Sequence, residues 1–137
     1  KALQEWQALI DDHGGDRFWR DAWDEKAYTL WTGLNQYKQA AETLQAYVAL
    51  MPGDEKASDF LYEAARILER GNDLEGAALQ WEKLMDQYPA SELSSRGLFL
   101  AGVTRYRMQQ YPQALTIFQR AQVLASTPPN RLRPCFG

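Results

Sequence analysis

The side chains suited to nucleophilic or metal-assisted catalysis are few and lie near the two ends of this 137-residue chain. His13 is the single histidine and Cys135 the single cysteine, so a Cys-His or Ser-His-Asp arrangement would have to use one of them. We interpret His13 as a helix-cap residue and Cys135 as an incidental thiol in a terminal tail. The usual zinc ligands are also too few for a metal site. The sequence therefore predicts no catalytic residue, no metal and no cofactor, and a chain that is not an enzyme.

Paired acids and paired glycines do not change this prediction. Asp11-Asp12 and Asp54-Glu55 fall at the ends of predicted helices, where carboxylates are favoured as capping or solvated groups. Gly14-Gly15 has neither the preceding strand nor the following lysine that a phosphate-binding loop requires.

Tryptophans form the most conspicuous aromatic group. Trp19, Trp23 and Trp31, with Ala27 between them, fall on one face of a predicted helix. Such a stripe can stack on sugar rings or nucleobases, or it can pack between helices. Trp6, on a neighbouring predicted helix, favours packing.

Charge is distributed unevenly along the chain, although the net charge is only −3. Residues 1–92 carry nine Lys and Arg against all eighteen Asp and Glu, and residues 93–137 carry six arginines with no lysine and no acid. The basic end could meet an acidic partner, or it could dock on a neighbouring segment of opposite charge. The overall acidity and the lack of lysine at that end argue against nucleic acid as the partner.

These side chains are positioned by a repeat of 37 residues. Small-then-large apolar pairs recur at that step, which indicates one supersecondary unit stacked on copies of itself. The equivalent positions are Ala40, Ala77 and Ala114; Leu44, Trp81 and Phe118; Tyr37, Leu74 and Tyr111; Ala27, Ala64 and Ala101.

Each unit is predicted to be a pair of helices joined by a short turn. The turns are Asn35-Gln36, residues 71–73 and Gln109-Gln110. Asp73 and Ser91 are placed for helix N-caps, and Gly71 for a C-cap. The predicted segments are 1–15 (an orphan second helix), 16–53, 54–90 and 91–127 (three repeats) and 128–137 (the start of a truncated helix or a tail). Because both ends lack a helix partner, we expect a piece of a longer solenoid.

The pattern resembles the tetratricopeptide (TPR) family, whose signature is W-x2-L-G-x2-Y, then A-x3-F, then P. The third unit matches it best, with Leu98, Ala101, Gly102, Ala114 and Phe118. It departs at Arg105, where an aromatic residue is usual, and the first unit departs at Tyr28, where a small residue is usual. The resemblance implies an all-α fold, a right-handed TPR-like α-solenoid of antiparallel helix pairs with a period of 37 residues.

The phrase YPASELSSRGLFLAG, residues 88–102, is similar to envelope-associated bacterial members of that family. It resembles the superhelix of soluble lytic murein transglycosylases, and also BamD- and CpoB-type proteins. The resemblance implies an extracytoplasmic location, in the periplasm or cell envelope. It also implies a scaffold that meets peptidoglycan through a parent enzyme. The alternative is a free-standing adaptor that binds a protein or peptide. No segment is apolar over the length that a membrane span requires.

The family binds partners on the concave surface lined by first helices. Carrying those positions onto this chain gives five candidate binding residues, which are Tyr62, Arg66, Phe99, Tyr106 and Arg107. Arginine would donate paired hydrogen bonds to a carboxylate, and the aromatic rings would supply apolar area. In the competing interpretation, Arg66 and Arg70 pair with Glu63 and Glu69 on a solvated helix. The asparagine and lysine of a carboxylate clamp are missing.

Overall fold

The computed structural model describes residues 4, 5, 7 and 17–126, and every regular element in that part of the chain is a helix. The elements are α2 (Arg17–Tyr28), η1 (Thr29–Gly33, a π-helix), α3 (Tyr37–Leu50), α4 (Ala57–Arg70), α5 (Leu74–Gln87), α6 (Glu92–Arg107) and α7 (Tyr111–Ser126).

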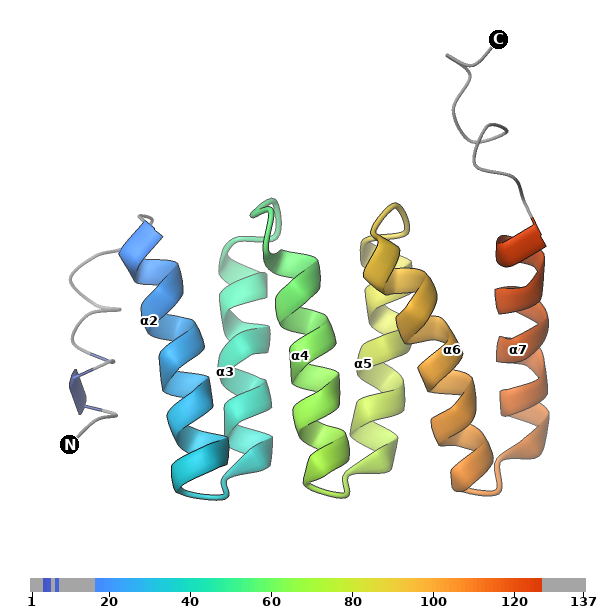
Figure 1. Ribbon diagram of the computed structural model, residues 1–137, viewed down its shortest axis with the longest axis horizontal. Coiled ribbons are helices and arrows are strands. Elements are labelled where there is room, and N and C mark those ends of the chain that lie inside the picture. The colour runs from blue at the N-terminus through green and yellow to red at the C-terminus, as the bar shows by residue number, and fades with distance from the viewer. Residues whose placement is uncertain (1–3, 6, 8–16, 127–137) are drawn as a thin grey trace, which may run out of the picture.

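The helices stand side by side in chain order, with α2 at one end of the row and α7 at the other (Figure 1). Each helix packs against the next, and α4 also contacts α6. The second helices of the pairs begin at Tyr37, Leu74 and Tyr111, so the 37-residue step of the sequence is also the step of the structure. The predicted all-α solenoid of TPR-like helix pairs is confirmed.

Apolar residues at the repeated positions form the core. The stripe of α3 is buried at Ala40, Leu44 and Tyr47, and the stripe of α5 is buried at Ala77, Trp81 and Leu84. The heptad-like spacing of these side chains places them on one side of each helix, where they meet the helices before and after. The core is therefore a series of seams between neighbouring helices, as expected for a solenoid.

The seam between α5 and α6 shows how closely a following first helix approaches. A Cβ built on Gly97 would lie 3.0 Å from Cδ1 of Trp81 and 3.1 Å from Cδ2 of Leu84. The buried Ser94 hydroxyl donates to the carbonyls of Leu84 and Tyr88 at the end of α5. Small residues on α6 thus let it sit directly on the large side chains of α5.

The turn inside each pair uses the same backbone device. Asn35, Asn72 and Gln109 have positive φ of 56°, 65° and 63°, and they too are 37 residues apart. The next residue then donates its N–H back into the helix, from Asp73 to the Leu68 carbonyl at 2.9 Å and from Gln110 to the Arg105 carbonyl at 2.9 Å. This is the hydrogen-bond pattern that closes a helix through a left-handed residue.

The helix caps follow the sequence prediction with one refinement. Asp73 accepts from the N–H of Gly76 at 3.0 Å, and Ser91 accepts from the N–H of Leu93 at 3.2 Å. Gly71 is the C-cap of α4, but its φ is −81°, so the left-handed residue of that turn is Asn72. Gly71 is required for space instead, because a Cβ there would lie 2.6 Å from the Cβ of Tyr37.

The first pair differs from the others where the sequence departs from the family pattern. Beyond Tyr28 the helix widens into the π-helix η1, and the closing bond runs from the N–H of Gln36 to the Leu30 carbonyl at 2.8 Å. That bond spans six residues, whereas its counterparts in the other two turns span five. The first pair thus reaches its left-handed residue at the same repeat position as the other two pairs, but through a π-helical turn.

Several predictions concern residues outside the described part of the chain. They are the predictions for His13, Gly14-Gly15, Asp11-Asp12, Cys135 and residues 128–137, and the side chain of Trp19 also falls there. Of the predicted orphan helix, residues 4 and 5 and residue 7 are described, and each is helical. Lys26 on α2 donates to the side-chain oxygen of Gln7 at 2.7 Å, so this segment contacts the first pair.

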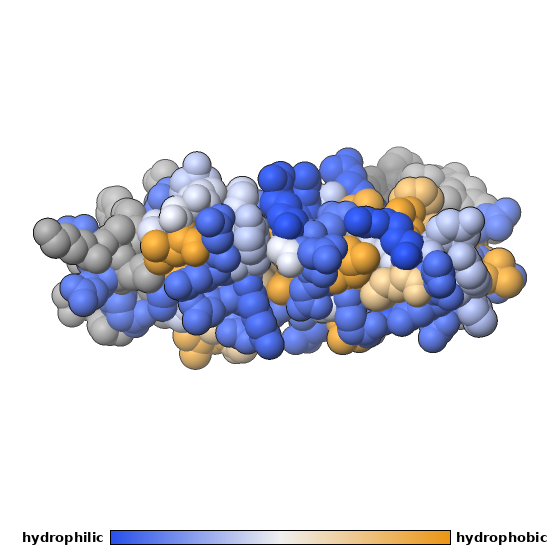
Figure 2. Space-filling model, turned by 90° about the horizontal axis from the view of Figure 1, so that it is seen from below, coloured by the Kyte–Doolittle hydropathy of each residue, from blue (hydrophilic) through white to orange (hydrophobic). Residues whose placement is uncertain are grey.

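None of the described helices combines the length and the apolar content needed to cross a bilayer. Seen from the end that carries the turns inside the pairs, the surface is mainly hydrophilic, with separate hydrophobic patches (Figure 2).

Candidate interaction surface

The first helices of the three pairs, α2, α4 and α6, supply the surface on which binding is predicted, and we call it the first-helix face. Arg107 at the end of α6 bonds to Glu69 of α4 at 2.8 Å, which joins two of these helices directly. Asp24 of α2 and Glu63 of α4 lie close enough for their charges to interact. Side chains of neighbouring first helices therefore interact with one another along the row.

Tyr62 and Arg66 lie one helical turn apart on α4 and form the centre of this face. Tyr62 is half-buried and packs against the core, so its ring position is fixed. Arg66 is exposed and makes no hydrogen bond or ion pair within the described residues. An exposed guanidinium beside a fixed aromatic ring can bind a carboxylate through paired N–H donors.

The competing interpretation, in which arginines of α4 pair with Glu63 and Glu69 of the same helix, is not seen within the described residues. Glu69 bonds to Arg107 instead of to an arginine of its own helix. Arg70 lies over the ring of Trp31, with its Cζ 5.1 Å from the ring centroid. Exposed pairs within a helix are worth only a few tenths of a kcal/mol, so contacts to the neighbouring pair decide the geometry.

Phe99 and Tyr106 lie apart from the Tyr62 and Arg66 pair, because both rings meet α7. The ring of Phe99 is 5.7 Å from that of Phe118, and the ring of Tyr106 is 5.1 Å from that of Tyr111. The structure thus places the five candidates in three locations. Tyr62 and Arg66 lie on α4, Arg107 bridges α4 and α6, and the two aromatic residues lie at the α6–α7 end.

Acidic groups gather on the α2 side of the first-helix face. The pKa of Asp24 is raised, first by desolvation from surrounding atoms and then by the negative charges of Glu25, Glu63 and Asp21. Because the ionised form of Asp24 is disfavoured there, a cationic group from a partner would relieve the repulsion. The first-helix face therefore presents an acidic group on α2 and the exposed guanidinium of Arg66 on α4.

Two of the described tryptophans are engaged in packing contacts. Trp23 is half-buried, with its ring 6.0 Å from that of Tyr47. Trp31 is half-buried between Arg70 and Tyr28, whose ring lies 5.9 Å away at 79°. These contacts support the packing interpretation for both residues.

Two ionic clusters were not predicted from the sequence. Arg105 is 8% exposed and donates to Glu82 at 2.9 Å, to Glu75 at 3.0 Å and to Gln110 at 2.9 Å. Burial lowers the pKa of Arg105, but the hydrogen bonds and charges of Glu82 and Glu75 outweigh that effect and raise it. The sequence offered one signal of this cluster: Arg105 stands at a position where the family usually has an aromatic residue.

The second cluster joins α2 to the loop after α3. Asp54 accepts from Tyr47 at 2.5 Å, from Arg20 at 3.0 Å and from the N–H of Lys56 at 2.8 Å. Burial would raise the pKa of Asp54, but these bonds lower it, and burial together with the bond to Asp54 raises the pKa of Tyr47. Both clusters hold helices together, and Glu82 and Arg105 of the first cluster also line a cavity of about 420 Å³ at the start of α7.

Within the described residues, no three His, Cys, Asp or Glu side chains are grouped so that they could hold a metal ion. A search of curated proteins finds no match to the chain. Residues 59–91 and 96–123 each match the tetratricopeptide repeat family, and these segments run from α4 into α5 and from α6 into α7. Together with the helical repeat architecture, the two matches support a TPR-like protein, and repeats of this kind are typical of protein–protein interaction scaffolds.

Proposed function

We propose that this chain is a non-catalytic scaffold that binds a protein or peptide on its first-helix face. The observation that carries the proposal is the exposed Arg66, which has no ion pair in the described part of the chain and lies one helical turn from the half-buried Tyr62, with the acidic group around Asp24 on the adjacent first helix. A segment that offers a carboxylate to Arg66 and a basic side chain to the α2 end would complement both charges.

Nucleic acid is a poor fit as the partner. Three of the four described arginines after Glu92 are already in ion pairs, which are Arg105, Arg107 and Arg120. Binding to phosphates would require these cations to leave carboxylates that already neutralise them.

Photo-crosslinking from the first-helix face tests the scaffold proposal. A benzophenone amino acid placed at position 66 should capture a partner in cells that express the protein. The same group at Lys83, exposed on the second helix α5, is the control.

Once the partner is identified, its affinity for variants of the chain can be measured. Arg66→Glu should weaken that affinity at least about fivefold, because a repulsive charge replaces the donor. Lys83→Glu, an equal charge change on the second helix α5, should leave the affinity unchanged. Capture from position 83 alone, or equal loss in both variants, would refute binding on this face.

We propose further that the parent is a bacterial cell-envelope protein, and specifically that this is the superhelix of a soluble lytic transglycosylase. The similarity of residues 88–102 to envelope members of the family supports this. Sequencing the parent gene on both sides should reveal a leader upstream and a lysozyme-like domain downstream whose catalytic glutamate is followed by serine. An open reading frame with further repeats and no such domain would favour the free-standing adaptor. Recovery of the native protein in the cytosolic fraction would contradict the envelope location.

A further inference from the structure

A cavity recurs between successive second helices, next to the turns inside the pairs. One lies between α3 and α5, has a volume of about 180 Å³ and includes Leu68 of α4 in its lining. The other lies between α5 and α7, has a volume of about 420 Å³ and includes Arg105 of α6 in its lining. We call the second one the Arg105 cavity.

The two cavities occupy the same place in the repeat. Three lining residues of the Arg105 cavity each follow a lining residue of the first cavity by 37 positions, which are Glu82 after Gln45, Arg105 after Leu68 and Thr116 after Leu79. The first cavity is flanked by α3 and α5, and each of these helices packs against a described helix before and after it. A cavity at this position is therefore a property of the repeat, and not of the end of the described chain.

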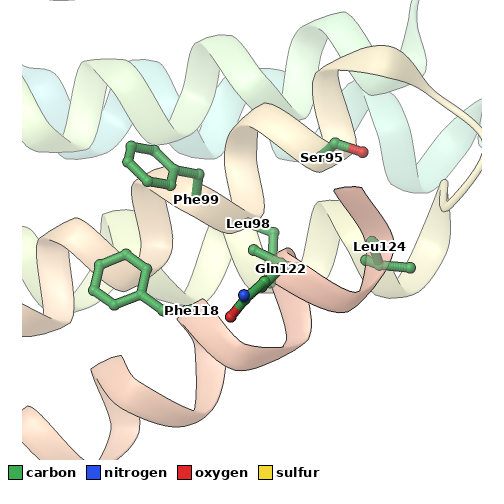
Figure 3. Close-up of a pocket in the computed structure, with 7 residues that line it drawn as sticks. Ser95, Leu98, Phe99, Phe118, Gln122 and Leu124 are labelled. Atoms are coloured by element: carbon green, nitrogen blue, oxygen red, sulfur yellow. The ribbon is translucent and has the colours of Figure 1, made fainter. Parts of the chain in front are cut away.

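The cavity between α6 and α7 is different in this respect (Figure 3). It has a volume of about 580 Å³, and Phe99 and Phe118 supply part of its apolar lining. No described helix follows α7, so a further helix of the same chain could cover that surface. Its exposure therefore does not identify a partner.

Arg105 stands at the position where the first cavity has Leu68. Both residues are nearly buried, at 8% and 5% exposed. Leu68 shows that an apolar side chain is compatible with this position of the fold, and apolar residues are often as stabilising as a buried ion pair. The guanidinium therefore gives the Arg105 cavity a polar chemistry that packing alone does not require.

Within the described residues, Arg105 and Glu82 each keep one polar atom without a hydrogen-bond partner. Nε of Arg105 donates to Oε2 of Glu82 at 2.9 Å, and Nη1 donates to Glu75 and Gln110, which leaves Nη2 of Arg105 and Oε1 of Glu82. Neither of these two atoms is among the buried polar atoms that lack a partner in the described chain, so both are open to solvent. Because both residues line the Arg105 cavity, it offers a donor and an acceptor on two groups that are already bonded to each other.

The charges around the Arg105 cavity favour a neutral ligand group. Glu75 and Glu82 carry two negative charges against the one positive charge of Arg105, so an anion is repelled. A cation would compete with Arg105, which is already bonded to both carboxylates. A neutral group that accepts one hydrogen bond and donates another satisfies both free atoms and leaves the charges as they are.

The primary carboxamide of glutamine or asparagine has this combination. Its carbonyl oxygen and its NH2 group are attached to one carbon, so an acceptor and a donor lie side by side. A backbone peptide group lacks this arrangement, because in the trans form its N–H and C=O point in opposite directions. A side chain is therefore favoured over the main chain as the ligand.

We propose that the Arg105 cavity binds the side-chain carboxamide of a glutamine or asparagine in a partner protein. Nη2 of Arg105 donates to the carboxamide oxygen, and the carboxamide N–H donates to Oε1 of Glu82. The methylene groups of the bound side chain pack on Pro112 and Ile117 in the cavity lining. The site is formed by α5, α6 and α7 and does not use Arg66, so the proposal does not depend on binding at the first-helix face.

A titration followed by nuclear magnetic resonance tests the proposal on the isotopically labelled full chain. The probe is N-acetyl-glutamine N-methylamide, which presents one glutamine side chain without terminal charges. It should cause saturable shifts of the Arg105 Nε–H signal and of the Thr116 amide, with a Kd on the order of 10 mM. The amide of Leu79, at the equivalent position of the first cavity, should not shift. The corresponding glutamate and lysine derivatives should bind about tenfold more weakly, because each adds a charge to the site.

One pair of variants locates the site. Thr116→Trp places a large ring over the Arg105 cavity from an exposed position of α7 and should abolish the shift of the Arg105 Nε–H signal. Leu79→Trp, the same change at the equivalent exposed position of α5, should leave that shift unchanged. If circular dichroism shows that Thr116→Trp is unfolded, the contrast between the Thr116 and Leu79 amides of the native protein locates the site instead.

Several results would overturn the proposal. They are the absence of a saturable shift at Arg105, equal affinity for the glutamate or the lysine derivative, and a shift that Thr116→Trp leaves unaffected. Tighter binding of free L-glutamine than of the blocked probe would also overturn it, because the ligand would then be a free amino acid and not a side chain of a protein.

Discussion

At the residue scale, two charged clusters connect helices that are distant in sequence. Arg105 of α6 reaches Glu75 and Glu82 of α5, and Asp54 receives Arg20 of α2 and Tyr47 of α3. Each cluster places a nearly buried ion among several hydrogen-bond partners, which is the arrangement in which such a group stabilises a fold. Removing one partner leaves the others without their counter-charge.

Arg105→Met should lower the free energy of unfolding by about 2 kcal/mol, because Glu75 and Glu82 lose their buried counter-ion. Urea denaturation followed by circular dichroism measures the change. In a double-mutant cycle with Glu82→Gln, we expect a coupling energy of about 1 kcal/mol. Arg96→Met, which removes an exposed arginine without a partner in the described chain, should change stability by less than about 0.5 kcal/mol. Strict additivity in the cycle would contradict the role of the pair.

Asp54→Asn should lower stability at pH 7 by about 1 to 2 kcal/mol, because an amide cannot accept bonds from Arg20 and Tyr47 as a carboxylate does. The pKa of Asp54 is depressed in the folded state. Its contribution is therefore complete above its unfolded pKa of about 3.9 and is lost as the pH falls through the folded value. Urea midpoints measured between pH 7 and pH 2 should converge for the native and variant proteins at the acidic end. A gap that stayed constant with pH would exclude the carboxylate as its origin.

At the scale of elements, the turns inside the helix pairs are the most regular feature. Their left-handed residues are Asn35, Asn72 and Gln109. Asparagine tolerates this conformation better than most residues, whereas glutamine has a longer side chain and no local hydrogen bond that favours it. The third turn is therefore the one that carries backbone strain.

Gln109→Gly should raise the free energy of unfolding by about 0.5 to 1 kcal/mol, because glycine adopts positive φ without steric cost. Asn72→Gly should give a smaller gain. Gln113→Gly, the same change inside α7, should instead destabilise by about 1 kcal/mol. Thermal unfolding of the three variants separates these effects, and a loss of stability in Gln109→Gly would show that the left-handed residue is not strained.

The sequence was sufficient for features that depend on neighbours along the chain. The turn at residues 71–73 and the caps at Asp73 and Ser91 were predicted because turn and cap chemistry is local. The partners of Arg105 were not, since they lie 23 and 30 residues away and no local rule links them. The sequence signals η1 only through Tyr28, which stands where the family usually has a small residue, and no local rule predicts the π-helix that follows it.

At the scale of the whole molecule, each helix is stabilised by the interfaces that it forms with its neighbours in the row. Helices α3, α4, α5 and α6 each pack against a described helix before and after them, while α7 packs against α6 and no described helix follows it. In a solenoid the interface terms add between nearest neighbours, so a helix with one seam opens more easily than a helix with two.

Hydrogen exchange measured by mass spectrometry should therefore show graded protection. We expect amides of α5 to exchange at least about tenfold more slowly than those of α7 under native conditions. Uniform exchange along the row would mean that the helices open as a single cooperative unit.

The candidate binding surface could be predicted only as a set of positions in the repeat. Tyr62 and Arg66 fall on the first-helix face because they belong to a first helix. The separation of Phe99 and Tyr106 from them depends on contacts with α7 that the period does not encode. Phe99 is 54% exposed, whereas Tyr62 at the same repeat position is half-buried and packs against the core.

The 37-residue step has a consequence for how such a chain changes length. Because Asn72 and Gln109 occupy the same place in successive turns, removal of residues 74–110 would join Asp73 to Tyr111 and leave a complete turn and cap between α4 and α7. Duplication of the same block would insert one more pair with every turn intact. In-frame recombination between copies of the repeat would therefore yield foldable proteins of different reach, and the gene can vary the span of the scaffold by whole units.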